Sequence, residues 1–167
     1  MFKTADLCDE HFDKGIIQIC QPVFSDFGGY HQFHAKIHTI HFFEDNSNNR
    51  EAVSTTSDGG VLVVDAGASL QCAMLGDMLA EKAVKNGWSG IIMNGLIRDS
   101  DEISGMSLGL KALGTCPLKS IKKGLGSRDV PVAFAGVRFV PGDYVYADQD
   151  GIIVSTEPLM AERSSEQ

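Results

Sequence analysis

The sequence predicts an α/β fold, and three stretches of the chain indicate it. Residues 61–65 are a continuous apolar run after an Asp-Gly-Gly turn, which is typical of a strand buried on both faces. A helical pattern follows at 77–86, and a second buried strand follows at 91–93. Strand, helix and strand in this order favour a parallel pair with a right-handed crossover. Beyond residue 130, short β-like runs alternate with turns and add further strands.

The amino-terminal part of the chain mixes helix and strand signals. Thr4 can cap a helix that continues to about Phe12, and Gly15 can end it. The stretches expected to follow are a strand at 16–20, a turn-rich loop at 24–29, a long strand at 33–43, a polar turn at 44–49 and a short helix at 50–56.

The helix between the two buried strands has clear start and stop signals. Gly76 can serve as its N-cap, Asp77 lies in its first turn, and Gly87 stops it. Its 3.6-residue period is traced by Met78, Leu79, Lys82, Ala83 and Asn86.

The carboxyl-terminal half is expected to be rich in strands. A strand at 107–115 is weakened by two glycines, and the basic stretch 119–128 is expected as a surface loop. Further strands are expected at 130–134, 137–140, 144–147 and 152–154. We therefore expect one domain over residues 1–157 and a flexible tail over 158–167.

Composition narrows the classes of function. A chain of 167 residues with 43% apolar and 22% charged residues suits one soluble domain. The net charge of −8 argues against a nucleic-acid surface, which needs a basic patch, although an acidic surface could meet a basic protein. The chain has no apolar run long enough for a membrane span and no secretory pattern at its start. Its four irregularly spaced cysteines then indicate buried thiols in a reducing cytoplasm.

The start of the central helix is a candidate anion site. The backbone amides of Gly76, Asp77, Met78 and Leu79 have no partner within the helix, and the helix dipole favours a negative charge there. A substrate carboxylate would fit. The alternative is that Asp77 is only an acid that suits the first turn of a helix.

Arg98 and Asp99 directly follow the second buried strand. Twenty residues separate Asp77 from Arg98, and one helix plus one strand would return the chain to the same edge of the sheet. The guanidinium offers a planar fork for a carboxylate or an enolate oxygen. Asp99 is a hard oxygen ligand suited to Mg²⁺ or Mn²⁺. Alternatively the two residues form a surface pair, or Asp99 caps a short helix.

Two other patterns are better explained by ordinary structural roles. The four histidines His31, His34, His38 and His41 lie in one region, but only His34 and His38 share a strand face, and a zinc site needs three or four ligands. The stretch Gly105–Gly109 matches G-x-S-x-G, a hydrolase motif that requires a strand before it and a helix after it. Neither the preceding strand nor the following helix is expected here.

The chain resembles a known family at these residues. Asp77 followed by Arg98-Asp99 is similar to the signature of the 4-hydroxy-4-methyl-2-oxoglutarate aldolases, which group with the regulator of ribonuclease E activity A (RraA) proteins. The resemblance extends over most of the chain. Its further segments are 4–9, 24–29, 43–46, 61–65, 136–143 and 147–152.

The resemblance implies a β/β/α sandwich of the swivelling-domain type, assembled as a homotrimer or a dimer of trimers with sites at subunit interfaces. It implies a class II pyruvate aldolase that uses a divalent metal cation, with oxaloacetate decarboxylase activity as a companion. The amides of Gly76, Asp77, Met78 and Leu79 would hold the substrate carboxylate. Arg98 would bind substrate and stabilise the enolate, Asp99 would anchor the metal largely through waters, and Asp77 would orient a water or relay a proton.

One departure from the family leaves the proton donor open. Longer aldolases of this family add a carboxyl-terminal extension that brings a carboxylate from a neighbouring subunit. The tail of this chain offers only Glu157, Glu162 and Glu166. Two other functions are possible expectations. One is a protein inhibitor that binds ribonuclease E, which the acidic charge and the RraA-like segments support. The other is a sandwich domain without catalysis.

Overall fold

The computed structural model describes residues 1–45, 47–121, 124 and 126–160. Its helices are α1 (Thr4–His11), the 3₁₀ helix η1 (Phe12–Lys14), α2 (Ser47–Val53), α3 (Asp77–Lys85) and α4 (Ser100–Ser104). Its strands are β1 (Ile17–Ile19), β2 (Ser25–Asp26), β3 (Phe33–His41), β4 (Val61–Asp65), β5 (Ala73–Leu75), β6 (Gly90–Ile97), β7 (Gly109–Thr115), β8 (Ser127–Arg128), β9 (Val132–Phe134), β10 (Val137–Phe139), β11 (Tyr144–Ala147) and β12 (Ile152–Ser155).

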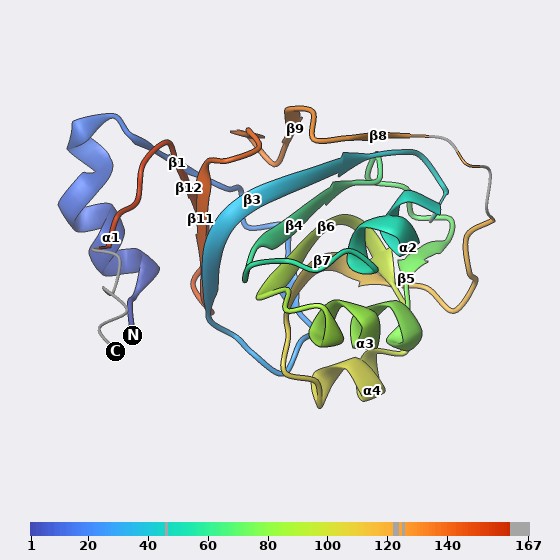
Figure 1. Cartoon of the computed structure of the whole chain (residues 1–167). Coiled ribbons are helices and arrows are strands. Elements are labelled where there is room, and N and C mark those ends of the chain that lie inside the picture. The colour runs from blue at the N-terminus through green and yellow to red at the C-terminus, as the bar shows by residue number, and fades with distance from the viewer. Residues whose placement is uncertain (46, 122–123, 125, 161–167) are drawn as a thin grey trace.

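A mixed sheet with strand order β1-β12-β11-β3-β4-β6-β7-β2 forms the centre of the molecule. The long strand β3 joins its two halves, because it pairs antiparallel with β11 on one side and parallel with β4 on the other. Strands β4, β6 and β7 continue the parallel half, and β5 runs parallel to β6 near its end. Figure 1 shows α2, α3 and α4 gathered at the parallel half and α1 at the opposite end, beside β11 and β12. The α/β prediction and the parallel strand–helix–strand unit are confirmed.

Alternate residues of β4 separate two layers of core. Leu62 and Val64 pack in the cluster that includes the α2 and α3 side chains, whereas Val61 and Val63 pack with residues of β9 to β12. All four side chains are almost fully buried, so the continuous apolar run is explained by a strand covered on both faces. Helices, sheet and a second β layer therefore stack in the order that a β/β/α sandwich requires.

The glycines of β6 and β7 make room for one aromatic ring. A Cβ atom placed on Gly90 or Gly109 would lie 2.4 or 2.0 Å from atoms of the Phe33 ring. Both glycines are therefore needed because another side chain packs directly on their backbone. Gly109 was expected to weaken its strand, and the Phe33 ring is the physical reason that it is retained inside β7.

The amino-terminal helix is attached to the sheet through a buried carboxylate. Asp148 accepts hydrogen bonds from the backbone N–H and the hydroxyl of Thr4, at 2.7 and 2.6 Å. Nearby, the Leu159 N–H donates to the Tyr146 hydroxyl, and Leu159 and Met160 pack on the same cluster as Phe2. This part of the predicted tail is thus in contact with the domain, and residues 161–167 lie outside the described residues.

Several sequence predictions differ from the structure. The sequence did not predict β5, β2 or β8, and α2 begins earlier than residue 50. Met78 was expected to trace the helical period with Leu79 and Ala83, but its side chain is exposed, and the buried face is formed by Leu79, Ala80 and Ala83. Of the four thiols, Cys20 and Cys72 are buried and Cys8 and Cys116 are only partly so. Within the part of the chain that the structure describes, no helix has the length and apolarity needed to cross a membrane.

Candidate active site

The ends of two neighbouring parallel strands bring the predicted site residues together. Strand β5 ends at Leu75, and Gly76 and α3 follow; β6 ends at Ile97, and Arg98 and Asp99 follow. The Arg98 N–H donates to the Leu75 carbonyl at 2.9 Å, which fixes the two chain ends side by side. The prediction that one helix and one strand return the chain to the same edge is correct.

The Asp99 carboxylate lies over the start of α3. Its Oδ2 accepts a hydrogen bond from the Asp77 N–H at 3.2 Å, and the Arg98 Nε lies 3.6 Å from the same oxygen. Asp99 is also the N-cap position of α4, yet its side chain makes no hydrogen bond to that helix. Its left-handed backbone, with φ of 56°, is compatible with this direction. Asp99 therefore precedes α4 in the chain, while its carboxylate accepts a hydrogen bond from the first residue of α3.

Gly76 is required by this close approach. A Cβ atom on Gly76 would lie 2.6 Å from Asp99 Oδ2 and 3.3 Å from Arg98 Nε. The backbone of Gly76 is extended, with φ of −128°, so its conformation would accept any residue. The carboxylate and the guanidinium, and not the backbone angle, thus explain the glycine at this position.

Two of the four amides expected to be free at the start of α3 already have acceptors. The Asp77 N–H is bonded to Asp99, and the Met78 N–H donates to the Asp77 Oδ1 at 2.7 Å. The expectation of four open donors is therefore wrong for these two, because acidic side chains fill the anion position themselves. The Asp77 carboxylate is held over its own helix by the same contact.

The exposure of the pair suits contact with a ligand from solvent. The side chains of Arg98 and Asp99 are 39% and 35% exposed. A partly exposed ion pair of this kind contributes on the order of 0–1 kcal/mol to stability, so little is lost when a ligand separates it. A planar guanidinium, a carboxylate and a helix start at one point can bind an anionic carbonyl compound.

A divalent cation fits Asp99 as an oxygen donor but lacks a full protein cage. Within the described ranges, no three His, Cys, Asp or Glu side chains lie close enough together to hold a metal ion by themselves. Mg²⁺ is commonly held by one or two carboxylates together with waters and substrate oxygens. A half-exposed carboxylate therefore fits an ion of this type, and a zinc cage of three or four protein ligands does not fit.

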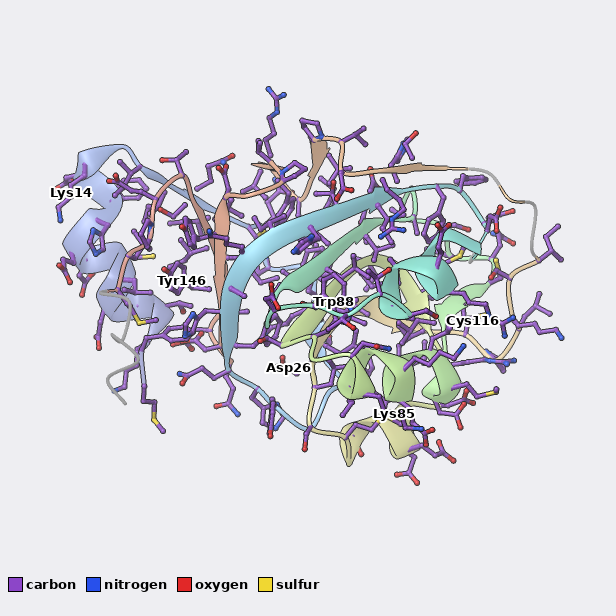
Figure 2. The ribbon with its side chains drawn as sticks, in the orientation of Figure 1. Lys14, Asp26, Lys85, Trp88, Cys116 and Tyr146 are labelled. Carbon is purple, nitrogen blue, oxygen red and sulfur yellow. The ribbon has the colours of Figure 1, made fainter. Side chains whose placement is uncertain are left out.

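A large cavity lies away from these residues. It measures about 1040 Å³ and is lined by residues of β3, by residues 55–60 before β4, by Trp88 before β6 and by Tyr144 and Tyr146 of β11. His34 stacks on Tyr146 in its wall, and the His38 ring meets the edge of Trp88. Burial, with the charge of the chain's amino terminus, lowers the pKa of His34. Figure 2 shows Tyr146 beside α1 and Trp88 beneath β3, in different parts of this wall.

The G-x-S-x-G stretch has the reverse of the hydrolase context. Helix α4 precedes it and strand β7 begins at its last glycine. A nucleophile elbow needs the strand first and the helix second. The sequence argument against a serine hydrolase is confirmed.

A polar cluster lies where β3 and β4 end beside the middle of β6, and only its His41 was singled out from the sequence. Asp65 Oδ1 accepts from the Asn94 side chain at 2.9 Å, and Asp65 Oδ2 lies 3.9 Å from His41 Nε2. The available signal was a polar residue at the carboxyl ends of β3 and β4, where parallel sheets gather ligand-binding groups. Asn94 lies within β6 and gave no such signal.

Comparison with known proteins decides the family. A family model described as RraA-like (Aldolase/RraA) matches residues 4–154. The chain belongs to the RraA-like family. Several relatives carry the name "Putative 4-hydroxy-4-methyl-2-oxoglutarate aldolase". The protein from Pseudomonas putida (strain W619) is 52% identical over 95% of this chain and 96% of its own, and the protein from Alkalilimnicola ehrlichii is 50% identical over 94% and 96%.

Two solved structures share the fold of this RraA-like chain. One is named the RNA-processing inhibitor RraA from Thermus thermophilis; it superposes with a TM-score of 0.91 at 38% identity over 98% of both chains. The other is named an S-adenosylmethionine:2-dimethylmenaquinone methyltransferase from Geobacillus kaustophilus HTA426, with a TM-score of 0.92 at 48% identity over 98% of this chain and 100% of its own. The relatives' names thus describe three different functions, and the chemistry of the site has to distinguish them.

Proposed function

We propose that this RraA-like protein is a lyase, a class II aldolase that uses a divalent metal ion. Its substrate is 4-hydroxy-4-methyl-2-oxoglutarate or a similar 4-hydroxy-2-oxo acid, which it cleaves to pyruvate and a second oxo acid. The observation that carries the proposal is the meeting of the α3 start, Arg98 and Asp99 at one edge of the sheet. The names of relatives at about half identity point the same way.

The chemistry of the cleavage needs what these residues offer. A retro-aldol reaction leaves pyruvate as its enolate, so negative charge builds on one oxygen. Arg98 would face that oxygen as a fixed cation, while amides at the start of α3 would hold the substrate carboxylate. Asp77 would orient a water or relay a proton. Removing one fixed donor of this kind typically costs about 3 kcal/mol, or roughly a hundredfold in rate.

Asp99 would hold Mg²⁺ or Mn²⁺, with waters in the remaining positions. The ion would supply Lewis acidity next to the developing enolate oxygen. Oxaloacetate decarboxylation produces the same pyruvate enolate, so we propose it as a companion activity of the same residues.

For the assembly we propose a homotrimer or a dimer of trimers, in line with the family resemblance. The proton donor stays open, and the carboxylates that the tail offers are Glu157, Glu162 and Glu166. Of these, Glu162 and Glu166 lie outside the described residues.

The test is direct measurement of pyruvate release. The protein is incubated with Mg²⁺ and 4-hydroxy-4-methyl-2-oxoglutarate, and pyruvate is coupled to a dehydrogenase. We expect turnover by the wild type and at least a hundredfold less by Arg98→Ala. Arg138→Ala, on β10, removes an equal charge and is the matched control. Absence of pyruvate with the wild type, or equal rates for wild type and Arg98→Ala, would reject the aldolase.

A second candidate function is inhibition of ribonuclease E by direct protein contact, without binding nucleic acid. It is supported by the likeness to the structure named an RNA-processing inhibitor and by the net charge of −8. An acidic surface favours a basic partner segment. A pull-down with purified ribonuclease E should then give a complex that weakens with salt, and recovery of no complex at low salt would exclude this role.

A further inference from the structure

We propose that the Asp99 carboxylate occupies the place of the substrate carboxylate in the free protein, so that the site is closed by its own side chain until the two exchange. The inference rests on the proposed function, because it concerns regulation of that same site. It predicts that Asp99 opposes the binding of an oxo-acid anion when no divalent cation is present.

The contacts of Asp99 are those that an incoming carboxylate would need. Its Oδ2 accepts a hydrogen bond from the Asp77 N–H at 3.2 Å and lies 3.6 Å from Arg98 Nε. These are a helix-start donor and a guanidinium, the two kinds of group that recognise a carboxylate. One N–H and one Nε–H cannot serve two carboxylates at full strength, and two anions at this spacing repel each other.

The absence of a side chain at Gly76 leaves room for the Asp99 carboxylate at the start of α3. The position 2.6 Å from Asp99 Oδ2 and 3.3 Å from Arg98 Nε is left open only because Gly76 lacks a side chain. The α4 backbone does not need the Asp99 side chain, since no hydrogen bond from that side chain caps α4. The carboxylate is therefore able to leave α3 without unfolding the helix that it precedes.

A divalent cation changes the competition in a defined direction. A carboxylate oxygen that ligates a cation gives up part of its hydrogen bonding, so the Asp77 N–H and Arg98 become available to the substrate. Cation binding should therefore raise the affinity for an oxo acid, and by reciprocity the oxo acid should raise the affinity for the cation by the same factor.

The experiment measures pyruvate binding to EDTA-treated protein by calorimetry or by ligand-observed NMR. Asp99→Gly removes the carboxylate, and glycine accepts the left-handed backbone at this position. We expect pyruvate to bind Asp99→Gly at least about fivefold more tightly than the wild type without metal, the gain from freeing a helix-start donor and a guanidinium. Asp101→Asn, in the first turn of α4, removes an equal charge and should leave the affinity unchanged.

Equal or weaker metal-free binding to Asp99→Gly than to the wild type overturns the inference, because a residue that serves only as a metal ligand gives that result. An equal gain in Asp101→Asn also overturns it, since the effect would then be general charge. If Asp99→Gly fails to fold, Asp99→Asn replaces it, with a smaller gain expected because the amide oxygen still accepts the Asp77 N–H. The outcome is separate from the aldolase test, in which wild-type protein with Mg²⁺ is assayed for pyruvate release.

Discussion

Replacement of Gly76 by alanine perturbs the site with a single methyl group and no change of charge. The new Cβ would lie 2.6 Å from Asp99 Oδ2, whereas ordinary contacts begin at 3.4 Å, so the carboxylate must retreat by roughly 0.8 Å. The hydrogen bond to the Asp77 N–H, already 3.2 Å long, would then be broken. A partly exposed charged hydrogen bond of this kind contributes about 1 kcal/mol, so the melting temperature should fall by only about 2–4 °C.

The loss of activity should be larger than the loss of stability. Arg98 and Asp99 are both displaced, and a shift of this size in positioning groups typically costs on the order of a hundredfold in rate. The assay is kcat/KM for pyruvate release with Mg²⁺, beside thermal unfolding of the same samples. Gly105→Ala is the matched control, because its Cβ would meet its nearest atom, the Glu102 oxygen, at 3.7 Å. Gly76→Ala with the activity of Gly105→Ala would show that the close approach has no part in catalysis.

Three further predictions concern the scaffold. Gly109→Ala should lower the free energy of unfolding by about 3 kcal/mol in urea titrations, because its Cβ would lie 2.0 Å from the Phe33 ring; an unchanged midpoint would contradict this packing. Burial favours a higher pKa for Asp148, but the hydrogen bonds from Thr4 and nearby amides outweigh it and lower the pKa below 3.8. A carboxyl group whose pKa is lower in the folded than in the unfolded state stabilises the protein at pH values above its unfolded-state pKa. This stabilisation is lost as the pH falls through its folded-state pKa. Asp148→Asn should therefore be less stable than wild type at pH 7, and the difference should shrink as the pH falls through the lowered folded-state pKa of Asp148; a difference independent of pH would contradict it. Ser107→Ala should retain full pyruvate release, since the residue follows a helix and precedes a strand. A large loss of the rate would contradict the rejection of the hydrolase motif.

The sequence was sufficient for the parts of the site that depend on chain order. The apolar run at 61–65, the capped helix and the second buried strand imply a parallel crossover, which brings Gly76 and Arg98 to the same edge of the sheet, and the pairing of β5 with β6 then places them side by side. Strand β5 was missed because three apolar residues between loops give no periodicity. Its pairing with β6 exists only in the folded sheet.

The direction of the Asp99 side chain could not be read from the sequence. An aspartate before a short helix usually caps that helix, and local rules predict that role. The left-handed backbone and the space above Gly76 turn the carboxylate to α3 instead, and both are products of tertiary packing. The buried ion pair between Lys111 and Asp26, at 2.8 Å, was hidden for the same reason, since a lysine in a strand is ordinarily exposed.

A crystal structure of the protein with Mg²⁺ and pyruvate tests the central claim most directly. The account predicts pyruvate at the start of α3, its carboxylate on the Asp77 N–H and Arg98, with Asp99 turned from that amide toward the cation. Pyruvate found in the large cavity beside Trp88, or bound elsewhere while Asp99 keeps its hydrogen bond to Asp77, would contradict both the assigned site and the exchange.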